Sequence, residues 1–250
     1  MKVLFLGTGT SRGVPSIGCS CPVCSSPDEK NKRLRPSVLI RENDYHLLID
    51  TSSDFRQQML RHKVDRIDAV LFTHHHADHL MGLDDIRAYT DRQGPIVLYA
   101  GAQTLAEIRI TFRYVFQPQP YFGWPRLETQ ELKGPRQLGP LKVEPLTVMH
   151  GTMPITGYRI GDFAYLTDVS RIPEDVRPRL TGLKVLVLGA LRHKPHPAHL
   201  SVGEAVAQAQ AIGAGQTYFI HMTHELDHEK TNAQLPPGIQ LSYDGLEVEL

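Results

Sequence analysis

The chain has 250 residues and a balanced charge of 27 basic and 27 acidic side chains, with a pI near 7.2. A dedicated nucleic-acid surface is usually basic, so this balance disfavours a nucleic-acid-binding protein. No segment is apolar and long enough to span a bilayer, and the N-terminal segment lacks the cleavage site of a signal peptide. The sequence therefore predicts one α/β domain over residues 1–250, in a cytoplasmic protein that does not bind a membrane.

Apolar runs that predict strands recur along the chain, with helical patterns between them. The expected strands are residues 2–6, 37–41, 45–49, 69–72, 96–99, 141–148, 157–160, 163–166, 185–188, 217–220, 240–243 and 247–250. The expected helices are residues 53–62, 81–89, 102–116 and 201–212. Turn residues at 42–44 and 243–246 predict two hairpins. This order of elements favours packed sheets with helices outside them.

The most informative run is residues 73–79, which follows the expected strand at 69–72. It places His74, His76, Asp78 and His79 in the register H-x-H-x-D-H. Imidazole and carboxylate groups suit zinc and also accept manganese or iron. Four such groups on one turn are too crowded for a single ion that stays open to water, so the run favours two adjacent ions. The alternative is a solvated, tag-like cluster, but that would not include Asp78 or follow a buried strand.

Five more ligand-type side chains stand at or just beyond the ends of other apolar strands. They are Asp50, His150, Asp168, His221 and His224. Strand-end loops gather distant side chains around one crevice, so the set predicts a shared site although each residue alone reads as structural. We expect Asp50, with Thr51 and Ser52, to fix the orientation of the histidines, although Asp50 also reads as a cap at a hairpin end.

All three cysteines lie within six residues, as Cys19, Cys21 and Cys24. An odd and clustered set makes a poor disulfide framework, and in a cytosolic protein such clusters more often bind metal. The 13 histidines leave a fourth ligand available. The alternative is three reduced thiols in a surface loop.

The order of these residues resembles the metallo-β-lactamase superfamily across nearly the whole chain. The resemblance implies a four-layer αββα sandwich with two divalent metal ions between its sheets. It implies that one ion is held by His74, His76 and His150, the other by Asp78, His79 and His221, and that Asp168 bridges both. An aspartate at the bridging position fits the hydrolytic branches and disfavours the zinc β-lactamases, which carry a cysteine near it.

The cysteine pattern resembles the phosphoribosyl 1,2-cyclic phosphate phosphodiesterases of the PhnP type. In that group three cysteines and a late histidine bind a structural zinc, which implies a closed Cys₃His site completed by His224 and a zinc-binding loop at about residues 11–35. The resemblance also implies that His199 protonates the leaving oxygen or stabilises the phosphorane. His193 and His196 are nearby competitors for that role, and an ordinary histidine at the head of a helix is the alternative.

The resemblance thus implies a metallohydrolase that cleaves a small cyclic phosphodiester with a water molecule that two metal ions activate and Asp78 orients. The metals would be zinc, manganese or iron, and the protein a homodimer. Three alternatives stay open. A nuclease acting on RNA or DNA ends is disfavoured by the neutral charge, a thioesterase or lactonase by His199, and a silent metal-binding protein by the full ligand set.

Two regions have no clear reading from sequence. Residues 117–125 are aromatic and proline-rich and read either as a lid or as a surface loop, and residues 113–138 are candidates to line the substrate pocket. Arg12, Arg87 and Arg192 are candidate phosphate contacts, but each reads equally well as a solvated surface charge.

Overall fold

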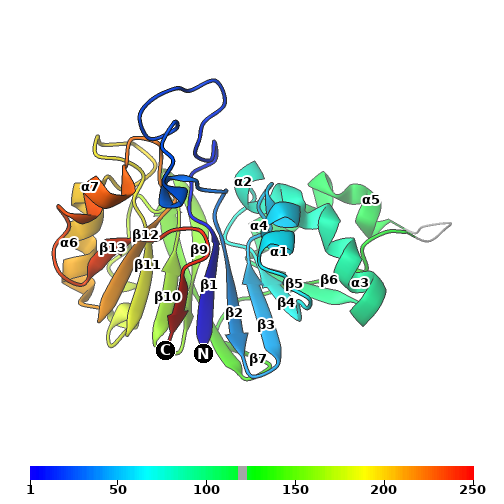
Figure 1. Cartoon of the computed structure of the whole chain (residues 1–250). Helices are drawn as coiled ribbons and strands as arrows, with labels where there is room; N and C mark the ends of the chain where they lie inside the picture. The colour runs from blue at the N-terminus through cyan, green and yellow to red at the C-terminus, as the bar shows by residue number, and fades with distance from the viewer. Residues whose placement is uncertain (118–122) are drawn as a thin grey trace.

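The computed structural model describes residues 1–117 and 123–250, and its strands form two seven-stranded sheets packed face to face (Figure 1). In spatial order the first sheet contains β14 (Glu247–Glu249), β1 (Lys2–Gly7), β2 (Ser37–Glu42), β3 (Tyr45–Ile49), β4 (Ala69–Leu71), β5 (Ile96–Ala100) and β6 (Leu127–Glu131). The second contains β13 (Ile239–Leu241), β12 (Gln216–Ile220), β11 (Val185–Gly189), β10 (Phe163–Leu166), β9 (Met153–Ile160), β8 (Leu141–His150) and β7 (Arg136–Leu138). Strands β3 to β6 and β10 to β13 are parallel, and the remaining pairs are antiparallel.

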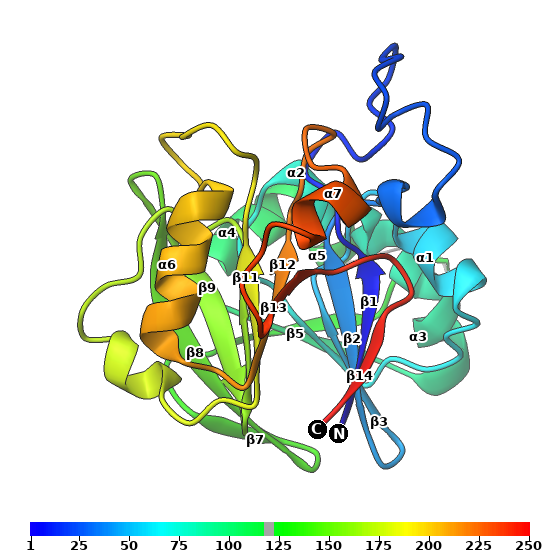
Figure 2. The same cartoon turned by 60° about the vertical axis from the view of Figure 1, so that its left-hand side comes forward.

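Helices cover the outer face of each sheet (Figure 2). The first sheet carries α1 (Phe55–Arg61), α2 (Ala77–Leu80), the 3₁₀ helix η2 (Met81–Ile86), α3 (Arg87–Gln93), α4 (Ala102–Thr111) and α5 (Arg113–Phe116). The second carries α6 (Val202–Ile212) and the 3₁₀ helix η3 (Arg177–Leu180), while α7 (His228–Asn232) packs against β13. The predicted single-domain αββα sandwich is confirmed.

Alternating side chains along each strand build both faces of the sandwich. On β1, Val3 and Phe5 point toward the second sheet, whereas Leu4 and Leu6 lie beneath the helices. This period of two is the geometry of a pleated strand. Because each sheet is covered on both sides, its strands read as continuous apolar runs, which is why the sequence revealed them.

The structure departs from the predicted elements where the sequence is polar or the pairing is longer than the apolar run. Strand β9 begins at Met153 rather than at 157, because it pairs with β8 as far as His150. The edge strands β6 and β7 were not predicted, since both are largely polar. The expected helix at 102–116 breaks at Phe112, and the one at 81–89 divides into η2 and α3.

One of the two predicted hairpins is wrong. The turn at 42–44 joins β2 to β3 as expected, with Asn43 in the left-handed region at φ 53°. At 243–246 the turn forms, but β13 and β14 lie in opposite sheets. The buried Asp244 carboxylate accepts hydrogen bonds from Thr8 Oγ1 (2.8 Å) and Leu34 N (2.7 Å), and so ties the chain to the first sheet at the point where it crosses over.

The segment at 113–138, expected to line a pocket, connects the two sheets. Its described part forms α5, then β6 at the edge of the first sheet and β7 at the edge of the second. Residues 118–122, within the possible lid at 117–125, lie outside the described residues. Over the two described ranges, no helix has the length and apolar character needed to cross a membrane.

Candidate functional site

The predicted ligands gather at one edge of the sandwich, where several strands end. The 73–79 run follows β4, His150 closes β8, Asp168 follows β10 and His221 follows β12. The chain termini lie at the opposite edge (Figure 1). Both sheets therefore contribute side chains to a single site.

Three residues of this site have a left-handed backbone, which is uncommon outside glycine. Asp50, Asp168 and His221 have φ values of 65°, 56° and 62°. Each stands one or two residues after a strand, where the chain leaves the sheet. Such conformations cost free energy and tend to concentrate at functional sites. The backbone conformation and the ligand side chains therefore indicate the same site.

One group of four buried side chains has the spacing of a tetrahedral metal site. It consists of Asp78, His79, Asp168 and His221. His221 Nε2 lies 3.3 Å from Asp78 Oδ2 and 3.2 Å from Asp168 Oδ2, and His79 Nε2 lies 3.4 Å and 3.3 Å from oxygens of the same two aspartates. Ligands about 2.0–2.1 Å from a zinc ion would be about 3.4 Å apart at tetrahedral angles, so the four residues fit such an ion.

A second group consists of His74, His76 and His150 and adjoins the first. Asp168 reaches both groups, because its Oδ2 also lies 3.9 Å from His74 Nε2. His76 is exposed, so this side of the site opens to solvent, as a catalytic metal site requires. Within the described ranges, the buried Nε2 atoms of His74 and His79 have no hydrogen-bond partner, and a bound cation would satisfy both.

The charges within the site also favour a cation. Burial alone would lower the pKa of His79, but Asp168, Asp78 and Asp50 together outweigh it and hold that pKa well above its usual value. Burial would raise the pKa of Asp168, but His221 and His79 reverse this and hold it well below. The carboxylates therefore remain ionised, and a cation at Nε2 would take the place of the proton that they hold on His79.

Hydrogen bonds to the far ring nitrogens aim three of the histidines into the site. His79 Nδ1 donates to Asp50 Oδ2 (2.8 Å), and His150 Nδ1 donates to the Ala198 carbonyl (2.8 Å). The Thr73 hydroxyl lies 3.0 Å from His74 Nδ1 and donates to Asp50 Oδ2 (2.8 Å). Such partners fix the tautomer and leave Nε2 free for a metal.

Two of these contacts were missed from the sequence, and two that were predicted do not form. The only sequence signal for Thr73 is its place at the start of the histidine run. Ala198 orients His150 through its backbone carbonyl, which no side-chain pattern can indicate. Thr51 and Ser52 do not contact the histidines: their hydroxyls donate to Leu80 O (3.2 Å) and Gln58 Oε1 (3.0 Å). They stabilise the segments around the site.

An Asp50→Asn substitution should weaken metal binding by about 10- to 100-fold. A side-chain amide places an N–H group either against Thr73 N, which donates to Asp50 Oδ1, or against His79 Nδ1, forcing the wrong tautomer. Metal affinity measured by competition with a chelator tests this, with Asp44→Asn on the exposed hairpin turn as the control. Equal affinities in the two variants would contradict the role of Asp50.

His199 lies beside both groups. Its Nδ1 is 4.0 Å from Asp168 Oδ2, and its ring stacks on His221 at a centroid distance of 4.9 Å. Burial, with the neighbouring His221, lowers the pKa of His199 to about 3. The ring is thus neutral near pH 7 and can donate a hydrogen bond from one nitrogen. The candidate phosphate contacts Arg87 and Arg192 face acidic partners, Asp84 and Glu225, while Arg12 is exposed.

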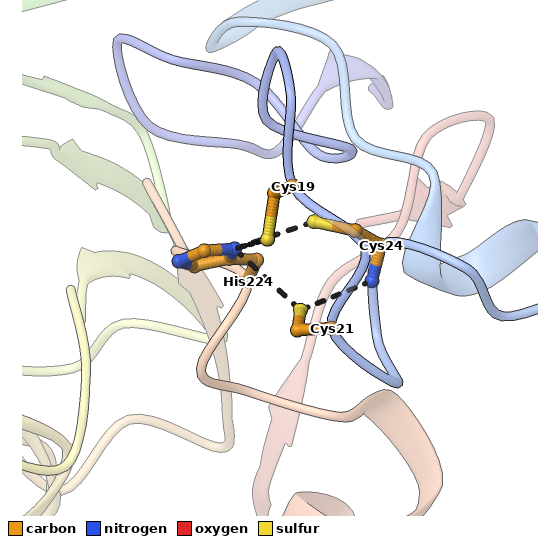
Figure 3. Close-up of side chains that lie close together, drawn as sticks. All are labelled: Cys19, Cys21, Cys24 and His224. Carbon is orange, nitrogen blue, oxygen red and sulfur yellow. Dashed lines mark hydrogen bonds between the residues drawn. The ribbon is translucent and has the colours of Figure 1, made fainter.

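The three cysteines of the long N-terminal loop and His224, which follows β12, form a separate cluster (Figure 3). His224 Nδ1 lies 3.2, 3.6 and 3.3 Å from the sulfur atoms of Cys19, Cys21 and Cys24. Tetrahedral zinc with these ligands would place each sulfur about 3.5 Å from the nitrogen, so the cluster fits a closed Cys₃His site. Amide N–H groups of Cys24 and Ser16 point at the sulfurs of Cys21 and Cys24, as suits thiolates.

A buried arginine, not predicted from the sequence, ties this loop to the chain that carries His224. Val14 and Arg33 exchange backbone hydrogen bonds (2.8 and 2.7 Å) that close the loop at its base. The Arg33 guanidinium, 1% exposed, donates to Thr223 O (3.0 Å) and Leu226 O (2.7 Å). The cysteine loop and the end of β12 therefore form one packed unit.

Comparison with known proteins gives one family match and one close structural neighbour. A family model described as a beta-lactamase superfamily domain matches residues 45–222, a span that contains both histidine and aspartate groups and His199. The crystal structure of a new diphosphatase from the PhnP family is 44% identical, with a TM-score of 0.94, and the alignment covers 100% of this chain and 97% of that one.

Two other comparisons limit what can be transferred. An octanoyltransferase of Porphyromonas gingivalis is 42% identical over 99% of this chain, but the chain spans only about half (51%) of that relative's length. The Zn²⁺-bound PqqB of Methylobacterium extorquens is 21% identical with a TM-score of 0.82 over the whole of both chains. At that identity it shows the fold alone.

Proposed function

The chain belongs to the β-lactamase superfamily and, within it, to the PhnP family, and we propose that it is a metal-dependent hydrolase that cleaves a P–O bond in a small phosphate substrate. The observation that carries this proposal is the juxtaposition of two ligand groups sharing Asp168 with a neutral histidine, His199, on the same site. The named activity of the diphosphatase neighbour supports the same class of reaction.

Divalent ions held by the two groups would polarise a phosphoryl oxygen and activate a water molecule for attack on phosphorus. The ligands we propose for one ion are His74, His76 and His150, and for the other Asp78, His79 and His221, with Asp168 shared. A carboxylate oxygen of Asp78 can also accept a hydrogen bond from the attacking water and so orient it. His199 donates a hydrogen bond to the substrate's phosphoryl oxygen, where negative charge accumulates in the transition state.

The substrate we propose is a small phosphodiester, either a cyclic one such as phosphoribosyl 1,2-cyclic phosphate or one joined through a diphosphate. The neutral overall charge supports a small molecule over a nucleic-acid backbone, whose binding needs concentrated Lys and Arg. The octanoyltransferase name applies to a relative about twice as long, so the other half of that relative can account for it.

A substrate panel tests the proposal on purified protein whose metal content has been measured. It compares a ribose 1,2-cyclic phosphate, a 2′,3′-cyclic nucleotide, ADP-ribose, bis-p-nitrophenyl phosphate, short RNA and an octanoyl thioester. We expect turnover of at least one small phosphodiester above that of an Asp168→Asn control. Turnover of RNA alone would indicate a nuclease, and turnover of the thioester alone an acyl hydrolase; either result would overturn the proposal.

A further inference from the structure

The segment between Leu191 and Leu200 is a closed loop fixed to the site. Leu191 N donates to Leu200 O (3.0 Å) across its base. Leu200 N donates to Val169 O (2.8 Å), directly after the shared aspartate, and Thr223 N donates to Leu191 O (3.0 Å), just past the ligand histidine of β12. The loop is therefore anchored to two strand ends that supply metal ligands.

A third anchor lies in the C-terminal part of this 191–200 loop. The Ala198 carbonyl accepts the Nδ1–H of His150, and the Ala198 side chain packs on Gly151, where a Cβ would lie 3.5 Å from the Ala198 methyl group. With both ends and Ala198 fixed, the part of the loop next to His196 has a set position relative to the metal ligands. Groups on it can therefore act as a rigid binding surface.

His196 is the residue of this loop whose donor is both oriented and available. The amide of Ala198 donates to His196 Nδ1 (3.2 Å), so the proton of the neutral ring is on Nε2. No residue in the described part of the chain accepts a hydrogen bond from that Nε2. The ring lies against His199, with centroids 5.1 Å apart, and both rings are partly exposed. A substrate group placed outward of His199 would meet this N–H.

The charge of the loop indicates what that group is. Residues 191–200 include Arg192 and Lys194 and no acidic residue. Arg192 donates to the carbonyls of Lys194 (3.3 Å) and Pro195 (3.2 Å) and lies 3.9 Å from Glu225, so it also stiffens the loop. Because Arg192 faces Glu225, Lys194 and the His196 N–H are the groups that the loop offers to an anion, and a leaving phosphate presents more charge to them than a phenolate oxygen does.

We propose that His196 binds the leaving phosphoryl group of a diphosphate-linked substrate through Nε2–H, so that the 191–200 loop selects substrates whose leaving group is itself a phosphate. This rests on the proposed phosphohydrolase function. In the reaction the water oxygen bonds to the attacked phosphorus, and the P–O bond to the bridging oxygen breaks with its electron pair on that oxygen. The protons of the water pass to the two phosphate products or to solvent.

The test compares two substrates that differ in the leaving group: ADP-ribose, a diester of diphosphate that leaves a phosphate, and bis-p-nitrophenyl phosphate, a phosphodiester that leaves a phenolate. In the metal-loaded enzyme, His196→Phe keeps the ring shape but removes the donor. It should lower kcat/KM for ADP-ribose about tenfold or more and change that for bis-p-nitrophenyl phosphate less than about twofold. His196→Gln, which restores an N–H, should recover part of the loss.

The matched control is His193→Phe, at an exposed position of the same loop, which should leave both substrates within about twofold of the parent. An equal fall for both substrates in His196→Phe would mean that His196 only maintains the loop, and would overturn the inference. No fall, or a parent enzyme that cleaves only bis-p-nitrophenyl phosphate, would overturn it too. A metal-loaded parent that cleaves no phosphate substrate at all would reject the proposed function and the inference together.

Discussion

Replacing Asp168 should lower hydrolysis by about 10³-fold or more, the factor that corresponds to several kcal/mol of lost transition-state stabilisation. Asp168 is the residue common to both ligand groups, lying within 4 Å of His74, His79 and His221. Its loss removes a ligand from both groups at once. We expect the bound metal to fall by at least one ion per chain, and turnover to fall with it.

The effect of losing the Asp168 carboxylate must be separated from the effect of backbone strain at this position. Asp168 has φ 56°, and an alanine there would add about 1–2 kcal/mol of strain, whereas asparagine tolerates this region. Asp168→Asn should therefore retain the parent's thermal stability more closely than Asp168→Ala, while both lose activity. Asp175→Asn, at an exposed position, is the control. An Asp168→Asn protein that kept its full metal content would contradict the shared-ligand assignment, and one that lost metal but kept parental turnover would contradict the role of that metal in hydrolysis.

Cys21→Ser should release about one zinc ion per chain and lower the melting temperature by about 5 °C or more, with a smaller effect on turnover below that temperature. The cysteine cluster binds no substrate group in our proposal. Its contribution is to hold the N-terminal loop against the segment after β12, as the Arg33 hydrogen bonds to Thr223 and Leu226 also do. A serine hydroxyl is a poor replacement for a thiolate ligand.

Zinc content by elemental analysis, thermal unfolding and kcat at low temperature are the three measurements. Ser20→Ala, an exposed neighbour in the same loop, is the matched control and should change none of them. If Cys21→Ser kept its full zinc content, the structural site would be refuted. If zinc were lost while stability stayed unchanged, the loop would not depend on the metal for its packing.

Local signals in the sequence revealed the buried strands and most of the ligand-type residues, and the resemblance to a known family supplied the sandwich and the grouping of the ligands. Apolar runs marked the strands, and Asp50, His150, Asp168 and His221 each stand within two residues of a strand end. What the sequence could not reveal depends on long-range pairing. The crossover at 243–246 resembles a hairpin until Asp244 is seen bonded to Thr8 and Leu34.

The buried polar contacts that support the site also could not be predicted from the sequence. Arg33 reads as a solvated charge, yet it is 1% exposed, and its guanidinium donates to two carbonyls and to the Asn31 side chain. Thr73 and the Ala198 carbonyl orient histidines through groups that no pattern of residue types distinguishes. The ligand types could be read from the sequence, but their supporting hydrogen bonds required coordinates.

The pairing of β1 with β14 has a consequence for synthesis on the ribosome. The N-terminal strand hydrogen-bonds the last strand of the chain, and Met1 N donates to Leu250 O (3.2 Å). His221, which approaches Asp78 from 143 residues away, is also translated late. Closing such long loops is slow and becomes favourable only when both ends exist. A nascent chain therefore cannot complete either candidate metal site before His221 and His224 have been translated.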